Sequence, residues 1–102
     1  LNTCTNLYGM ELRDCGLTGT LDLPTLISNI SLFSGLNVYG NPGLTKIILG
    51  SNLNLSGLAL DARECDANLE IVIESLARVT LANSLFTVGQ SGNVSTGTTF
   101  IA

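Results

Sequence analysis

Three cysteines, Cys4, Cys15 and Cys65, are the most reactive side chains that the sequence offers. The sequence has no histidine and no Cys-x-x-Cys pair, so the usual ligands of a tetrahedral zinc site are missing. Three thiols allow one disulfide plus one free thiol, or one intermolecular bridge, and the spacing does not choose a pairing. The competing interpretation is three buried apolar thiols.

A small acidic cluster is formed by Asp61, Glu64 and Asp66. A calcium site needs six or more oxygen ligands around a glycine-containing turn that this stretch lacks, so a solvated turn is favoured. No histidine is available for a catalytic triad, and no glycine-rich segment leads into a lysine-bearing helix. The sequence therefore predicts neither an enzyme nor a bound metal or cofactor.

Three sequons for N-glycosylation are present, Asn29-Ile-Ser, Asn54-Leu-Ser and Asn93-Val-Ser. In a protein that passes through a secretory route, we expect Asn29 and Asn93 to be the better acceptors, because both fall in predicted loops. Asn54 adjoins predicted strand residues.

Composition limits the partners of the chain. Of its 102 residues only 12% are charged, and 45% are apolar. Lys and Arg together number four against eight acidic residues, without a basic cluster, so nucleic-acid binding is not expected. No apolar run reaches the ~18 residues of a membrane-spanning helix. So apolar a composition predicts that part of the surface is covered by a protein partner.

The chain begins at Leu1 without methionine, which favours a processed or excised segment. We expect a secreted or cell-surface location, and a single domain over residues 1–102. Repeats are expected over residues 1–85, followed by a terminal strand segment rich in Gly, Ser and Thr over residues 86–102.

A leucine spacing, L-x-x-L-x-L-x-x-(N/C), indicates how these residues are positioned. Its members are Leu7, Met10, Leu12 and Cys15 in the first copy, and Phe33, Leu36, Val38 and Asn41 in the second, 26 residues later. Each copy is followed by Gly-Leu-Thr. A period in this range is typical of a solenoid, whose coils bury their apolar faces against one another. Cys15 then occupies a position that solenoids usually bury.

Beyond residue 43 the spacing returns at intervals of 11 residues, as Leu44-x-x-Ile47-x-Leu49 and Leu55-x-x-Leu58-x-Leu60. It predicts coils of about 22 residues. The phase stays open, because Arg63 stands where Asn41 predicts a polar turn residue and Cys65 lies two positions further on. Residues 25–32 are expected to form a short helix or loop, and residues 66–78 a helix. A competing interpretation places another coil over residues 76–84, and both can hold.

The stretch from Leu7 to Thr45 resembles the leucine-rich repeat family, and residues 46–85 resemble it loosely. Cys15–Leu21 is similar to plant-type and protist-surface repeats, and Phe33–Thr45 to repeats of plant receptors and bacterial surface proteins. The resemblance implies a right-handed solenoid with a parallel sheet on its concave face, protein or glycan recognition on that face, and no enzymatic activity. The irregular period leaves open whether the solenoid is a horseshoe or a more compact β-solenoid.

The expected fold class is α/β or mostly β, a short solenoid with parallel strands and an irregular convex side that includes a short helix. The residues expected on the concave surface are Tyr8, Glu11, Arg13, Asn37 and Tyr39. For the two tyrosines, ordinary half-exposed side chains are the competing interpretation.

The end of the chain is expected to form a β-hairpin or an edge strand. Its residues are Thr98, Thr99, Phe100, Ile101 and Ala102. Solenoids need polar caps, and neither end looks capped, so the leading hypothesis is an extracellular structural or adhesive subunit that associates head to tail into a filament or longer array. The alternatives are a recognition domain that binds a protein or glycan, and a pilin-like subunit that donates its last strand.

Overall fold

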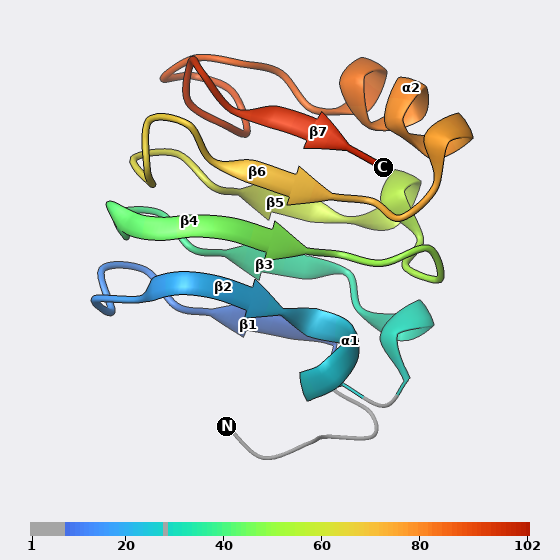
Figure 1. Ribbon diagram of the computed structural model, residues 1–102. Coiled ribbons are helices and arrows are strands. Elements are labelled where there is room, and N and C mark those ends of the chain that lie inside the picture. The colour runs from blue at the N-terminus through green and yellow to red at the C-terminus, as the bar shows by residue number, and fades with distance from the viewer. Residues whose placement is uncertain (1–7, 28) are drawn as a thin grey trace.

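Two parallel β-sheets form the body of the protein. The computed structural model describes residues 8–27 and 29–102 (Figure 1). The first sheet has the strand order β1 (Gly9–Glu11), β3 (Gly35–Asn37), β5 (Ala59–Asp61). The second has the order β2 (Thr18–Asp22), β4 (Gly43–Ile48), β6 (Glu70–Val72), β7 (Thr99–Ile101).

The chain adds one strand to each sheet in turn from β1 to β6, and the strands of one sheet run opposite to those of the other (Figure 1). After β6, a bridge between Val94 and Ala62 extends the first sheet by one contact before the chain enters β7. The result is a small α/β domain with two parallel sheets and few helices, which agrees with the expected α/β class.

Short helical segments join the second sheet to the first. They are α1 (Leu23–Leu26), the 3-10 turns η1 (Ile30–Leu32) and η2 (Leu55–Gly57), and α2 (Leu76–Leu85). The Asp22 carboxylate accepts hydrogen bonds from the backbone N–H and hydroxyl of Thr25 and so caps α1. Pro24 stands in the first turn of α1, where a missing N–H costs little. The short helix or loop expected over residues 25–32 is thus the end of α1 followed by η1.

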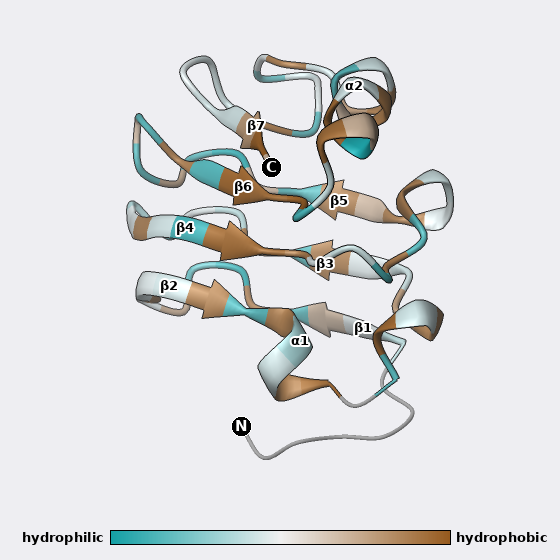
Figure 2. Ribbon diagram, turned by 45° about the vertical axis from the view of Figure 1, so that its right-hand side comes forward, coloured by the Kyte–Doolittle hydropathy of each residue, from teal (hydrophilic) through white to brown (hydrophobic). Residues whose placement is uncertain are grey.

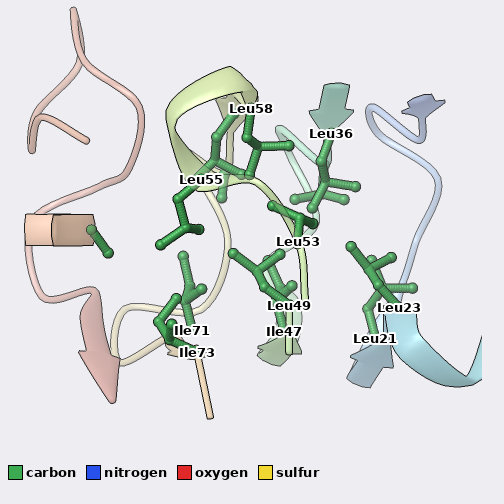
Figure 3. Close-up of a cluster of buried hydrophobic side chains, with 14 of the residues drawn as sticks. Leu21, Leu23, Leu36, Ile47, Leu49, Leu53, Leu55, Leu58, Ile71 and Ile73 are labelled. Atoms are coloured by element: carbon green, nitrogen blue, oxygen red, sulfur yellow. The ribbon is translucent and has the colours of Figure 1, made fainter. Parts of the chain in front are cut away.

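The core lies between the two sheets, and Figure 3 shows its side chains meeting there. In the second sheet, Leu21 pairs with Ile47, Ile47 with Ile71 and Ile71 with Phe100. This column of apolar side chains runs through every strand of that sheet, and all four are buried. Each strand of this sheet accordingly has a brown segment beside pale or teal ones in Figure 2, while most of the connecting loops are pale or teal.

The paired residues correct the predicted period and settle its phase. Met10 pairs with Leu36, which confirms the spacing of 26 residues between the first two copies, and Leu36 pairs with Leu60, so the next spacing is 24 residues and not about 22. The predicted alignment had matched Leu58, not Leu60, with Leu36. Once the pairing is known, Cys65 corresponds to Asn41.

The helix predicted over residues 66–78 is wrong. Those residues contain strand β6, and the helix, α2, begins at Leu76. Leu69, Ile71 and Ile73 are fully buried on alternate positions, which is the period of a strand, and β-branched residues favour that conformation. The competing coil over residues 76–84 is also wrong, because those residues are helical.

Candidate functional site

The outward face of the first sheet presents three rows of residues. Each row contains one residue from, or just after, each of the strands β1, β3 and β5. Strand register places Gly9, Gly35 and Ala59 in the first row and Glu11, Asn37 and Asp61 in the second. Arg13, Tyr39 and Arg63 follow two positions later and form the third. Because side chains alternate along a strand, the apolar residues between these positions face the core.

The first row is a lane almost without side chains. Gly35 lies at its centre, and a Cβ atom built there would meet no heavy atom within 4 Å. A groove of about 420 Å³ lies over this part of the sheet. Its lining residues are Gly9, Met10, Glu11, Gly35, Leu36, Asn37, Ala59, Leu60 and Asp61. A ligand in this groove can approach the backbone of three strands.

The second row combines two carboxylates with an amide. Asp61 is held by Arg63, whose Nη2 lies 2.8 Å from Asp61 Oδ2 and whose Nε donates to Oδ1 at 2.9 Å. The hydrogen bond from the Arg63 side chain lowers the pKa of Asp61 below its ordinary value of 3.8. Glu11 is far more exposed, and its contact with Arg13 is 3.9 Å long, so its carboxylate is open to solvent.

The third row is a stack of one aromatic ring between two cations. The guanidinium carbons of Arg13 and Arg63 lie 5.7 Å and 5.2 Å from the centre of the Tyr39 ring. Arg63 is also bonded to Asp61 and to the carbonyl of Gln90, whereas the Arg13 side chain remains 56% exposed. Arg13 therefore carries the donors of this row that can turn to a ligand.

Asn41 fixes the turns that follow these strands. Its side chain is fully buried; Nδ2 donates to the carbonyls of Leu12 and Val38, and Oδ1 accepts from the N–H groups of Cys15 and Leu17. Four backbone groups thus share one amide: three lie between β1 and β2, and one lies between β3 and β4. We call each such pair of successive strands, one from each sheet, a layer. In the next layer the Cys65 thiol takes the matching place and donates to the Val38 carbonyl at 3.4 Å.

Cys15, Asn41 and Cys65 occupy equivalent positions, and the residue before each of them has a left-handed backbone. These residues are Asp14, Gly40 and Glu64, with φ of 51°, 77° and 57°. At Gly40 this backbone favours glycine, and a Cβ atom there would also displace the exposed Asp14 carboxylate, which would stand 1.9 Å away. The same turn repeated in three layers keeps the three rows of the outward face in register.

The structure places four of the five residues expected on the concave surface on this face: Glu11, Arg13, Asn37 and Tyr39. Tyr8 is 60% exposed but precedes β1 and lies outside the three rows. Its carbonyl accepts hydrogen bonds from the backbone N–H groups of Ser34 and Gly35 and so ties the two layers together.

Sequence reasoning missed five residues of the face, namely Gly9, Gly35, Ala59, Asp61 and Arg63. The signal that could have found the last three was the alternative phase, in which Leu60 and not Leu58 matches Leu36. The two glycines were hidden because a glycine in a strand gives no hydrophobic pattern.

The cysteines occupy different environments. Cys15 is exposed, contrary to the expected burial, because among the described residues no further layer covers β1 from outside. Cys65 is half-buried, and burial raises the pKa of its thiol. Neither thiol forms a disulfide with another described residue, and Cys4 lies outside the described residues.

The acidic cluster is bonded within the protein. Asp61 binds Arg63, Glu64 accepts from the side-chain amide of Gln90, and Asp66 accepts from the backbone N–H of Asn68. Over residues 8–27 and 29–102, no group of three His, Cys, Asp or Glu side chains is placed to hold a metal ion.

The three sequons differ from the expected ranking. Asn29 and Asn54 are both exposed, and each stands immediately before a 3-10 turn. Asn93 is half-buried; its Nδ2 donates to the Leu60 carbonyl at 2.8 Å, and its Oδ1 accepts from the Thr87 N–H. Asn93 is therefore the least available of the three, because its side chain joins two layers.

The expected terminal strand is an edge strand and not a hairpin. β7 pairs in parallel with β6, and Phe100 is buried and stacks on Phe86 with ring centres 5.7 Å apart. Thr98 and Ala102 flank the strand. The segment predicted for donation to a neighbour is thus already paired within its own sheet.

The sequence and fold have no match among protein-family models, curated proteins or solved structures. In the described part of the chain, no helix has both the length and the apolar character needed to cross a bilayer.

Proposed function

We propose that the chain is an extracellular recognition module, built as a short leucine-rich-repeat-like solenoid, which binds a protein or glycan on the outward face of the first sheet. The observation that carries the proposal is the first row, the lane of Gly9, Gly35 and Ala59, which lies beside the polar second row. A Cβ atom at Gly9 would crowd the Gly35 carbonyl at 3.1 Å, but Gly35 itself has open space, so its small size leaves room for a ligand that lies against the sheet.

The chemistry of the rows favours an extended polar ligand. Carboxylate and amide oxygens of the second row can accept hydrogen bonds from sugar hydroxyls or peptide N–H groups. Arg13 can donate to a carboxylate or a carbonyl from the far side of that row. An oligosaccharide or an extended peptide crossing the strands meets both rows at once.

Filling the lane tests the proposal. In Gly35→Leu the new side chain has open space and stands at the centre of the groove. The matched control is Thr20→Leu, which adds a leucine at an exposed position of the second sheet. Wild type and both variants are applied to arrays of oligosaccharides and of extended peptides. We expect ligands whose affinity falls at least ~10-fold with Gly35→Leu, a loss of about 1.4 kcal/mol, and is unchanged with Thr20→Leu. Equal binding by all three proteins, or binding by none, contradicts the proposal.

A second function, end-to-end association into a structural or adhesive array, is favoured by the composition of the C-terminal end. Residues 79–102 carry no charged side chain. Apolar side chains are exposed on and beside α2, and they are Leu76, Leu81, Leu85 and Val88. At the opposite end, β1 and β2 are edge strands whose outer sides have no partner among the described residues. Two such ends are suited to heterologous contacts.

A further inference from the structure

Two of the three sequons occupy the same place in successive layers of the fold. Asn29 precedes η1 and Asn54 precedes η2, and these two turns lie one above the other on the side of the molecule where α1 and α2 also lie (Figures 1 and 2). The shared pattern is an asparagine, a buried apolar residue and an exposed serine. Sequence position alone had not indicated this equivalence.

The two turns also share their hydrogen bonds. The carbonyl of Asn29 accepts from the N–H of Leu32 at 3.2 Å, and the carbonyl of Asn54 accepts from the N–H of Gly57 at 3.3 Å. In both, the apolar residue after the asparagine anchors the turn, since Ile30 is 8% exposed and Leu55 is 2% exposed. The anchor holds each turn to the core while the asparagine side chain faces solvent.

The first of these asparagines is in contact with the hydroxyl of its own sequon. Ser31 Oγ donates to Asn29 Oδ1 at 2.9 Å, and both side chains are exposed. The Asn29 Nδ2 atom donates to no described residue. The acceptor nitrogen is therefore accessible in the folded protein.

The third sequon is built differently. Asn93 Nδ2 donates to the Leu60 carbonyl, and the hydroxyl of Ser95 accepts from the N–H of Glu64 at 2.8 Å. A glycan on Asn93 would stand between the last layer and the first sheet. The asparagine and the serine that the modification needs are thus both used to join layers.

We propose that Asn29 and Asn54 carry N-linked glycans and that Asn93 does not. The proposal rests on the extracellular location given above. In the reaction, Nδ2 of the asparagine forms a bond to C1 of an oligosaccharide carried on a lipid pyrophosphate. The C1–O bond breaks, the lipid pyrophosphate leaves with the bonding electrons, and Nδ2 loses one proton. The glycans would cover the side of the molecule that carries η1 and η2, and leave the groove open.

Site occupancy in a secreted product tests the proposal. The chain, directed by an added signal peptide, is expressed in cultured eukaryotic cells, and the secreted protein is digested after enzymatic release of its glycans in ¹⁸O-labelled water. We expect the label at Asn29 and Asn54 and not at Asn93. Ser31→Ala and Ser56→Ala should each remove one glycan, and the controls Ser31→Thr and Ser56→Thr should retain both. A label at Asn93 in the secreted protein, or its absence at Asn29 or Asn54, overturns the proposal.

The outcome is separable from that of the proposed recognition function. Neither acceptor lines the groove, so array binding by the enzymatically deglycosylated chain should equal that of the glycosylated chain. Unchanged binding after removal of the glycans would show only that the sugars have no role in recognition. The occupancy pattern alone decides which asparagines are acceptors.

Discussion

At the scale of single residues, Asn41 joins two layers through one buried amide, and its loss should be costly. Asn41→Ala leaves the Leu12 carbonyl and the N–H groups of Cys15 and Leu17 without this partner, while the Val38 carbonyl keeps only the Cys65 thiol. We expect the free energy of unfolding to fall by about 3–5 kcal/mol, because each unpaired buried group costs 1–3 kcal/mol. Urea denaturation measures this, with the exposed Asn52→Ala as control. A loss below about 1 kcal/mol in Asn41→Ala would show that water replaces the amide.

Asp61 should make stability depend on pH in the acid range. The pKa of Asp61 is lowered in the folded state, so between that pKa and 3.8 the unfolded chain binds more protons. The stabilisation by the Arg63 pair is therefore present above pH 3.8 and is lost as the pH falls through the folded pKa. Asp61→Asn should flatten the pH dependence of the unfolding free energy below about pH 4.

The Arg63 partner provides a control for this prediction. Arg63→Gln should flatten the same pH range, and the double variant should add little to either single variant, because the two residues act as one pair. Additive effects of the two substitutions would show that Asp61 and Arg63 stabilise the fold independently.

Among the elements, residues 66–78 show a local pattern that favours a helix, whereas long-range pairing forms a strand there. Leu69, Val72, Ile73 and Leu76 fit one face of a helix, yet β6 forms there because it is paired on both sides, with β4 and β7. That pairing joins Ile71 to residues 24 and 29 positions away, which a local window cannot contain. The strands at Met10 and Leu36 were predictable, because their two copies agree in spacing and in the turn that follows.

The outward face was predictable only as far as the repeat could be aligned. Glu11, Arg13, Asn37 and Tyr39 were found from alternation within two strands. Asp61 and Arg63 required the pairing of Leu36 with Leu60, and the repeat shortens by two residues at that point. The burial of Asn93 could not be predicted, because its partners Leu60 and Thr87 come from separate segments.

Helix α2 is the element on which end-to-end association should depend. Leu81 and Leu85 are one helical turn apart and are 39% and 37% exposed. Leu81→Glu combined with Leu85→Glu should leave the fold intact, since neither side chain belongs to the core. Sedimentation at rising protein concentration should show larger species for wild type and monomers for the variant. A wild-type chain that stays monomeric at high concentration would reject this second function.

At the scale of the whole molecule, the distinct surfaces are on different sides. The groove lies on the outer face of the first sheet, the apolar end lies around α2, and the two exposed sequons lie beside η1 and η2. Because the strands of both sheets are stacked in one direction, the groove and the two sequons are each formed by equivalent positions of successive layers, whereas the apolar end belongs to the last helix alone (Figure 1). Substitutions can therefore test the proposed recognition, association and modification separately.

Chemical-shift mapping can locate the bound ligand on the outer face of β1, β3 and β5, the proposed binding surface. The ¹⁵N-labelled chain is titrated with the oligosaccharide or peptide that binds it best on the arrays. We expect the shifted backbone amides to cluster at residues 9–13, 35–39 and 59–63. Shifts that cluster instead on the outer face of the second sheet, at residues 18–22 and 43–48, or on α2, would contradict it.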